Sequence, residues 1–240
     1  EVRKVLDEFG LEVSGICGMF SSNSELASSQ GGIRQRAIDY LKRNIELGYE
    51  LDAEYLLIVP AAVGRSESID EYEIDRSVET LAQVSDELES AGIKGAIEPI
   101  RSAETSIVHT FAEAEKYIER LSHPAVQWIN GDVYHMSQEE SHIGEAILEY
   151  GDRLVNLHLA DTNRRALGKG MLDLDTLLKA LYAVGYSKGE LYATAEPLGP
   201  GGNPYPAMHG KPDEGKLDDL VNDTVSYFRA RESAVKKELG

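Results

Sequence analysis

Residues 54–62 read EYLLIVPAA. Nearly every side chain in this run is apolar, which is typical of a strand that is buried on both faces. Strands of this kind belong to parallel sheets whose faces are covered by other elements, mostly helices. The flanking segments agree, because apolar residues recur at intervals of three and four from Ile33 to Gly48 and again from Val78 to Ala91. The sequence therefore predicts a buried strand with a helix before it and a helix after it.

The alternation of strand and helix continues along the chain. We expect strands at residues 11–18, 54–62, 95–100, 125–133, 154–160 and 191–197, and a closing helix at 217–228. Ser137 and Glu140 fit a capping box that opens the helix after the fourth strand. Asp173 is expected to cap the helix after the fifth strand, with Gly185 just beyond its end. Strict alternation predicts an α/β fold with a parallel sheet and helices outside it.

Six such units without a break in composition favour one domain over residues 1–240, a (β/α)8 TIM barrel. The alternative is an open, doubly wound sheet. A complete barrel averages about 250 residues. This chain opens with a helical pattern, so we expect that the first strand, preceding Glu1, is lacking from the sequence. A degenerate strand is expected within Arg164–Gly170, and the turn-rich stretch GPGGNPYP at residues 199–206 is expected to form a loop.

The composition limits the classes of partner. The 24 Lys and Arg residues against 42 Asp and Glu residues give a net charge of −18 and a pI near 4.7. This acidity argues against nucleic acid, which is held by Lys and Arg that neutralise phosphates. Cys17 is the only cysteine, so neither an intrachain disulfide nor a cysteine-based zinc site is expected. No apolar run approaches the roughly 18 residues of a membrane span. We expect a cytoplasmic protein that does not contact a membrane.

Four of the predicted strands carry a potential metal ligand at or near their C-terminal ends, namely Glu98, Asp132, His158 and Glu196. In a parallel barrel these ends share one face, on which the chemistry takes place. Three carboxylates and one imidazole suit a hard or borderline divalent metal such as Mn²⁺, Mg²⁺ or Co²⁺. Any one of these residues could instead be a hydrogen-bonded structural residue. Their recurrence on four successive predicted strands favours a metal site.

Four motifs resemble those of a known family. They are EPIRSAE at residues 98–104, DVYHM at 132–136, HLADTNRRALGKG at 158–170 and AEPLGP at 195–200. Together they resemble the xylose-isomerase-like TIM barrel superfamily of sugar isomerases and epimerases, and within it the D-tagatose and D-psicose 3-epimerase group. The similarity covers most of residues 11–240 in the order of elements and is most specific from residue 97 to 198. The sequence departs from the pattern at Ala160, where those epimerases usually carry Gly, and at Asp161, where they usually carry Glu.

The resemblance implies roles for individual residues. The metal ligands of the family fall on Glu98, Asp132, His158 and Glu196, and its substrate-contacting residues fall on Glu104, His135 and Arg164. The implied reaction is metal-dependent epimerisation of a ketose at C3 through a cis-enediolate. Two catalytic carboxylates, Glu98 and Glu196, would act as acid and base on the two faces of the sugar. The implied partner is a small-molecule sugar, and we expect a homo-oligomer.

Alternatives remain for both the residues and the reaction. His135 could be a surface histidine, Arg164 an exposed loop arginine, and Glu104 a cap of the helix that follows it. The same metal site could serve an aldose–ketose or hydroxypyruvate-type isomerase, or an enzyme that breaks the bond beta to the carbonyl. An apurinic-site endonuclease is disfavoured, since no histidine precedes His109 and the chain is acidic. A non-catalytic sugar-binding barrel would not require the four ligands.

Overall fold

A computed structural model describes residues 1–189, 191–198 and 214–240. The loop expected at residues 199–206 lies outside the described residues. The chain forms two compact units, Glu1–Asn130 and Gly131–Gly240, and the boundary falls inside one strand, β4 (Trp128–Asp132). Each unit is therefore treated separately, with β4 contributing to both.

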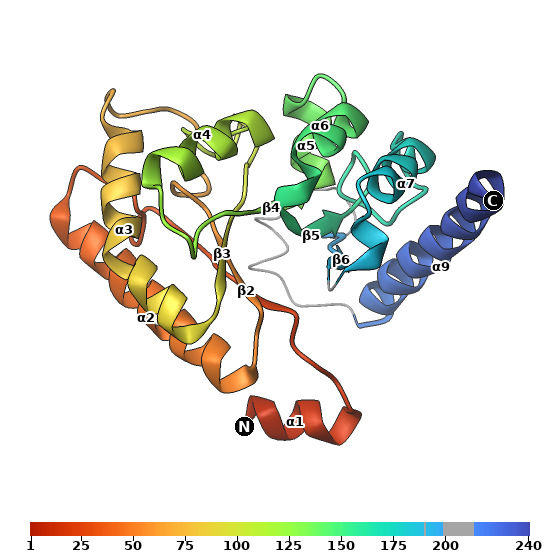
Figure 1. Ribbon diagram of the computed structural model, residues 1–240, viewed down its shortest axis with the longest axis horizontal. Coiled ribbons are helices and arrows are strands. Elements are labelled where there is room, and N and C mark those ends of the chain that lie inside the picture. The colour runs from red at the N-terminus through yellow and green to blue at the C-terminus, as the bar shows by residue number, and fades with distance from the viewer. Residues whose placement is uncertain (190, 199–213) are drawn as a thin grey trace. The chain divides into compact units, whose positions relative to one another are not determined.

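The first unit alternates helices with parallel strands. Before β4 its elements are α1 (Val2–Phe9), β1 (Gly15–Cys17), α2 (Gly31–Leu51), β2 (Tyr55–Ile58), α3 (Glu73–Ala91), β3 (Lys94–Ile97) and α4 (Phe111–Leu121). Strands β1 to β4 are neighbours in chain order, and each pairs in parallel with the next, with Gly15 opposite Tyr55 and Ala96 opposite Trp128. Helices α2, α3 and α4 lie side by side along these strands (Figure 1).

Burial explains these positions in the first unit. All four residues of β2 are buried, as the apolar run around them predicts. Helix α3 turns Leu81, Val84 and Leu88 inward at helical spacing, and all three are fully buried. Strand β1 can approach β2 closely because a Cβ at Gly15 would overlap the ring of Tyr55.

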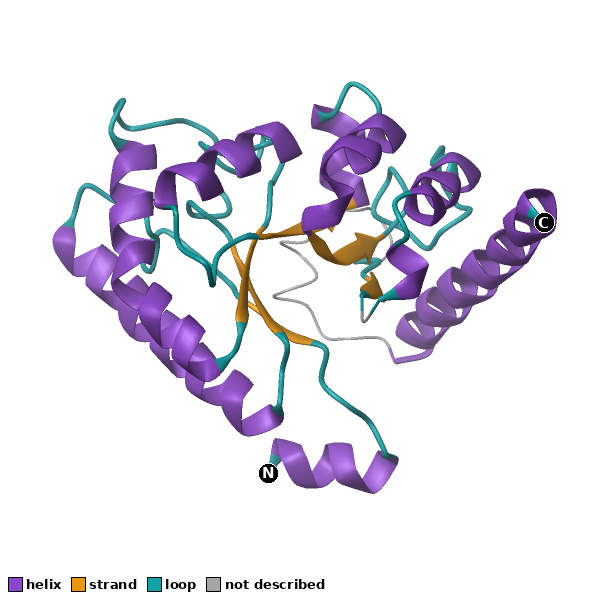
Figure 2. Cartoon of the chain, viewed as in Figure 1, coloured by secondary structure: helices purple, strands orange, loops and turns teal. Residues whose placement is uncertain are grey.

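The second unit continues the alternation (Figure 2). Its elements after β4 are α5 (Val133–Glu139), α6 (Ile143–Tyr150), β5 (Leu154–Leu159), α7 (Leu174–Ala183), β6 (Tyr192–Ala195) and α9 (Glu214–Leu239), with short 3-10 turns at Gly151–Arg153 and Tyr186–Lys188. Strands β5 and β6 pair in parallel. Helix α7 contacts α6 and α9. Asp173 caps α7 by accepting from Thr176 N at 3.1 Å, as expected from the sequence, and Gly185 beyond it is left-handed.

Two local expectations are wrong. The capping box at Ser137 and Glu140 does not open a helix, because Ser137 lies inside α5, which Asp132 caps instead. The cap of α6 is His142, whose Nδ1 accepts from Glu145 N at 3.2 Å. No strand forms within Arg164–Gly170, which is a loop between β5 and α7. In the first place the side chains of Asp132 and His142 accept the capping hydrogen bonds instead. In the second place the Asp161 side chain accepts from backbone amides of the loop, which favours a loop over a strand. All six predicted strands are present but shorter than expected.

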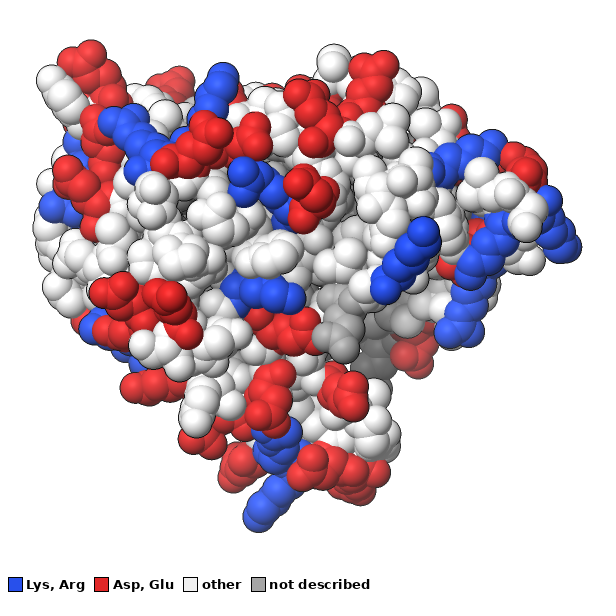
Figure 3. Space-filling view, in the orientation of Figure 1, with Lys and Arg blue, Asp and Glu red and all other residues white. Residues whose placement is uncertain are grey.

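The surface of the described residues agrees with the composition. Acidic side chains are interspersed with fewer basic ones on the face shown in Figure 3. Within residues 1–189, 191–198 and 214–240, no helix combines the length and the apolarity needed to cross a membrane.

Candidate active site

Asp132 is the last residue of β4 and also the N-cap of α5. Its Oδ1 accepts from Tyr134 N at 2.8 Å, and the residue is only 2% exposed. Burial by itself raises the pKa of the carboxyl, but the neighbouring His135, Arg164 and His158 outweigh it and lower the pKa to about 2. Asp132 is therefore an anion held in place by the start of a helix, which is suitable for a metal ligand.

Arg164 lies on the loop between β5 and α7 and reaches two carboxylates of the second unit. Its Nη1 donates to Asp132 Oδ2 at 2.8 Å, and its Nη2 donates to Glu196 Oε2 at 2.9 Å. The guanidinium carbon lies 4.6 Å from the ring centroid of Tyr134, within reach of a cation–π contact. The side chain is only 7% exposed. The alternative of an exposed loop arginine is therefore wrong.

His158 and Glu196 come from the two strands that follow β4 along the chain. His158 lies on β5, and Glu196 directly follows β6, where its backbone N–H donates to Leu159 O at 2.9 Å. The Nδ1 atom of His158 lies 3.4 Å from Glu196 Oε2. A ring nitrogen of His158 also lies within 4.8 Å of a carboxylate oxygen of Asp132. The second unit thus gathers two carboxylates and one imidazole, a donor set that fits a divalent cation such as Mn²⁺ or Mg²⁺.

His135 lies on α5, three residues after Asp132, and is buried at 4% exposure, so it is not a surface histidine. Its Nε2 lies 3.5 Å from Asp132 Oδ2 and 3.4 Å from Arg164 Nη1. Its Nδ1 is buried and has no hydrogen-bond partner among the described residues. A buried ring nitrogen without a partner is unusual, and a bound polar ligand would satisfy it.

Glu98 belongs to the first unit and directly follows β3. It is 6% exposed, and its backbone N–H donates to Ile58 O at 3.0 Å. Its Oε1 accepts from Nδ2 of Asn130, a fully buried residue of β4, at 2.7 Å. A buried carboxylate needs such a donor to offset its lost hydration. Glu98 is thereby fixed at the C-terminal end of its strand, as the sequence predicted.

Glu104 lies in the same unit, in the loop between β3 and α4. It is buried at 5% exposure, and Arg101 Nε donates to its Oε1 at 2.5 Å. Thr110, and not Glu104, caps α4, since the Thr110 side chain accepts from Glu113 N. The helix-cap alternative for Glu104 is therefore wrong.

The sequence reasoning missed two residues of this region. Asn130 interrupts the apolar run of β4 two residues before Asp132, so the period of a strand places both on one face. The spacing of two residues from Asp132 is therefore the sequence signal that points to Asn130. Asp161 stands out in the sequence only as a departure from the family pattern, but in the structure it is 1% exposed and accepts hydrogen bonds from several backbone amides. Its partners lie up to 11 residues further along the chain, which no periodicity reveals.

Another carboxylate–imidazole cluster lies on the first unit, where Asp86 and Glu89 approach His123. Ala125 N donates to His123 Nδ1 at 3.2 Å, so the proton of the neutral ring is on Nε2, which donates to Asp86 Oδ1 at 3.0 Å. In this tautomer Nε2 is a hydrogen-bond donor and offers no lone pair to a metal. Both ring nitrogens of His123 therefore have protein partners, as in a structural histidine.

Comparison with known proteins shows the family of this chain. Residues 1–200 match the family described as xylose isomerase-like TIM barrel. The chain is 28% identical over 186 residues to a ketose 3-epimerase of Arthrobacter globiformis, an alignment that covers 77% of this chain and 64% of that protein. It is also 28% identical over 204 residues to the 3-dehydro-D-guloside 4-epimerase of Escherichia coli K12, covering 80% and 75%. A solved structure of L-ribulose 3-epimerase superposes with a TM-score of 0.86 at 20% identity, covering 98% of this chain and 80% of that one.

The chain belongs to the xylose isomerase-like TIM barrel family. The predicted fold class is thereby confirmed, and the described residues form part of such a barrel. The predicted resemblance is confirmed as well, because the relatives include ketose 3-epimerases. The chain spans 64% of the length of the Arthrobacter globiformis relative.

Proposed function

We propose that this protein is a metal-dependent sugar epimerase that inverts a ketose at C3. The observation that carries the proposal is the cluster in the second unit. There Asp132, His158 and Glu196 lie at or next to the C-terminal ends of the successive strands β4, β5 and β6. Asp132 and His158 are almost completely buried, which is costly unless the cluster serves binding or chemistry. The names of the relatives support a sugar substrate, since each denotes a sugar epimerase.

In this proposal Glu98, Asp132, His158 and Glu196 hold a divalent metal. The metal, when bound, polarises the substrate carbonyl and stabilises negative charge that develops on its oxygens. Asn130 and Arg164 keep the carboxylates of Glu98 and Glu196 in defined orientations through hydrogen bonds of 2.7 and 2.9 Å. Without such partners a ligand carboxylate would rotate freely.

The proton transfers fall to the two glutamates. One carboxylate removes the proton from C3, and the electrons of the C–H bond move into the adjacent carbonyl to give the cis-enediolate. The other glutamate, in its acid form, returns a proton to the opposite face of C3, and the ketone is restored with inverted configuration. Each transfer by a positioned carboxylate accelerates the reaction about 10²–10⁴-fold. Glu104, His135 and Arg164 bind the substrate oxygens.

The test is solvent exchange in D₂O. Metal-loaded protein is incubated with a panel of free and phosphorylated ketoses, and the products are read by proton NMR. A true substrate gains deuterium at C3 and converts to its C3 epimer. Deuterium at C1 or C2 would instead indicate an aldose–ketose isomerase on the same site. Absence of exchange with every sugar, by protein shown to contain metal, would overturn the proposal.

Two variants test whether Glu98 and Glu196 transfer the protons. Glu98→Gln and Glu196→Gln keep the size of the side chain but remove the base, and each should lower the exchange rate at least about 10²-fold. The matched control is Glu71→Gln, the same change at an exposed position. Metal content is measured beside the rate, because both glutamates are also proposed ligands.

A further inference from the structure

The loop between β5 and α7 is organised around one buried carboxylate, that of Asp161. Its Oδ1 accepts from Thr162 N at 2.8 Å and from Leu172 N at 3.1 Å, and its Oδ2 accepts from Gly168 N at 2.8 Å. Backbone amides from both ends of the loop therefore converge on both oxygens of a residue that is 1% exposed. Such bonds to a charged acceptor are stronger than those between neutral groups.

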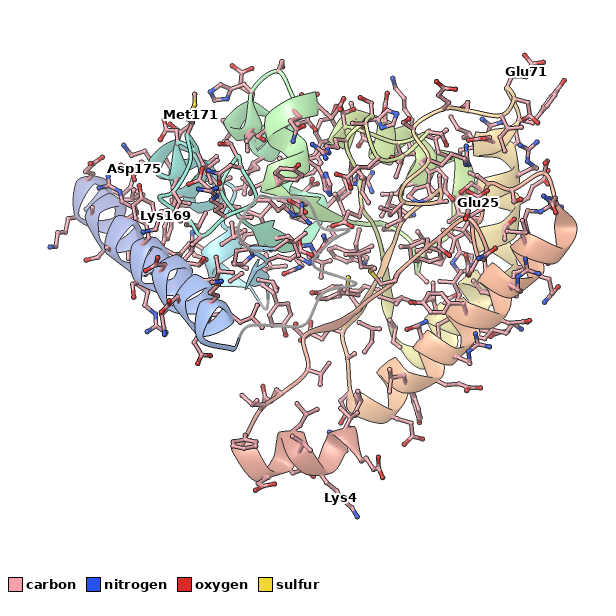
Figure 4. All side chains as sticks on the ribbon, turned by 180° about the vertical axis from the view of Figure 1, so that it is seen from behind. Lys4, Glu25, Glu71, Lys169, Met171 and Asp175 are labelled. Atoms are coloured by element: carbon pink, nitrogen blue, oxygen red, sulfur yellow. The ribbon has the colours of Figure 1, made fainter. Side chains whose placement is uncertain are left out.

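The loop leaves no spare room around this carboxylate. A Cβ at Gly170 would overlap Asp161 and Thr162. Gly168 has a φ of +81°, which favours glycine. The outer edge of the loop faces solvent, since Met171 is 90% exposed and projects away from the ribbon (Figure 4). The loop therefore takes its shape from the Asp161 carboxylate on its inner side.

The backbone of Asp161 also holds Arg164. Asp161 O accepts from Arg164 N at 2.8 Å, and Asp161 N donates to Arg165 O at 3.0 Å. Within this turn Arg164 has a φ of +60°, in the left-handed region that side-chain-bearing residues seldom adopt. Arg164 O in turn accepts from Leu198 N at 3.0 Å, two residues after Glu196. An unfavourable conformation of this kind persists only when its surroundings enforce it.

We propose that Asp161 is a positioning residue, which acts by holding Arg164 in the conformation that bridges Asp132 and Glu196. If the proposed function is right, Asp161 thereby sets where the Arg164 guanidinium meets the substrate. Asp161 itself lies under the loop and bonds to backbone amides, so its contribution to the reaction passes through Arg164. The proposal rests on the proposed function only for that last consequence, because the placement of Arg164 can be measured without any substrate.

The experiment compares the reactivity of two neighbouring arginines towards phenylglyoxal. Arg164 is buried, whereas Arg165 beside it is exposed and serves as an internal standard. Modification at each is quantified by mass spectrometry after non-tryptic digestion. Asp161→Asn leaves one buried amide without an acceptor, so modification of Arg164 relative to Arg165 should rise about fivefold to tenfold, the factor expected for one lost hydrogen bond.

Two further variants make the result decisive. Asp173→Asn is the matched control, because it makes the same chemical change at the exposed cap of α7, without contact to Arg164, and Asn also caps helices well. Gly170→Ala displaces the Asp161 carboxylate without removing it, and should expose Arg164 as Asp161→Asn does. Gly170 is exposed, so this variant keeps the test available if Asp161→Asn fails to fold. Reactivity of Arg164 unchanged in a folded Asp161→Asn or Gly170→Ala protein would overturn the proposal.

A double-mutant cycle adds the link to activity. Asp161→Asn should lower kcat/KM of the metal-loaded enzyme about tenfold, mainly through KM, but should have little further effect once Arg164→Ala is present, because residues that act through one another are not additive. Additive losses would mean that Asp161 acts on stability and not through Arg164. If the protein epimerises no sugar, the phenylglyoxal result still decides the structural proposal.

Discussion

Asn130 donates a hydrogen bond of 2.7 Å from its Nδ2 to Oε1 of Glu98. Both residues are buried, and the bond joins the end of β3 to the middle of β4. One amide therefore orients a carboxylate for which we propose both metal binding and proton transfer. The amide is neutral, so it fixes the carboxylate without competing for its charge.

Asn130→Ala should reduce both stability and turnover. Removing the donor leaves a buried carboxylate without this partner, which costs about 1–3 kcal/mol of the free energy of unfolding. Urea unfolding measures that loss, and the C3 exchange assay measures turnover. The control is Asn156→Ala on β5, also fully buried, whose Oδ1 accepts from Thr194 Oγ1 at 2.9 Å. It should destabilise comparably and leave turnover per folded molecule nearly intact. Equal losses of turnover in both variants would contradict a specific role for Asn130.

Asp132→Asn should weaken metal binding while the cap of α5 remains. Asparagine caps helices about as well as aspartate, so α5 should keep its hydrogen bond from Tyr134 N. The change removes the negative charge, and metal affinity measured by calorimetry should fall by more than the roughly 10–100-fold typical of losing an outer partner of a ligand. Circular dichroism checks that the fold remains. Wild-type affinity in a folded variant would remove Asp132 from the proposed ligand set.

The strands could be predicted because their signal is local. The run EYLLIVPAA at residues 54–62 shows a strand buried on both faces without knowledge of its neighbours, and β2 forms inside it. The ends of the strands likewise indicate Glu98, Asp132, His158 and Glu196 as candidate ligands without knowledge of their contacts. The hydrogen bonds that orient these side chains, however, come from partners that are distant in sequence. Asn130 is 32 residues from Glu98, and Arg164 is 32 residues from both Asp132 and Glu196.

The loop at residues 161–172 shows why the rest could not be predicted. The glycines and polar residues there are compatible with several conformations, and a weak strand pattern at Arg164–Gly170 misled the prediction. The outcome is decided by the Asp161 carboxylate, which offers the backbone better hydrogen bonds than a strand would. A residue such as Arg164 at positive φ follows from those bonds and not from its own propensity.

Arg65 should stabilise the first unit through its ion pairs. Its Nη2 donates to Glu25 Oε2 at 2.9 Å and its Nη1 to Glu73 Oε1 at 2.7 Å, which joins the loops after β1 and β2 to the start of α3. Glu25, labelled in Figure 4, and Glu73 are both buried. Arg65→Met should lower the free energy of unfolding by about 3 kcal/mol, the low end for breaking a buried pair, because Arg65 is 20% exposed. The control is Arg3→Met, which breaks an exposed pair with Asp52 and should cost under about 1 kcal/mol. Similar losses in the two variants would argue against the network.

The same network predicts how stability depends on pH. Burial raises the pKa of Glu73, but hydrogen bonds from Ile69 N, Ser106 and Arg65 outweigh it, so the pKa is lowered from its ordinary value of 4.5. A lowered pKa in the folded state means that Glu73 stabilises the fold fully above pH 4.5 and loses that contribution as the pH falls below 4.5 through the folded-state pKa. Glu73→Gln removes the titration while keeping the size of the side chain. The difference in unfolding free energy between wild type and Glu73→Gln, measured in urea, should therefore be largest near pH 7 and should shrink steadily on acidification below pH 4.5. A difference that stays constant down to pH 3, or that grows, would show that Glu73 is not the titrating group.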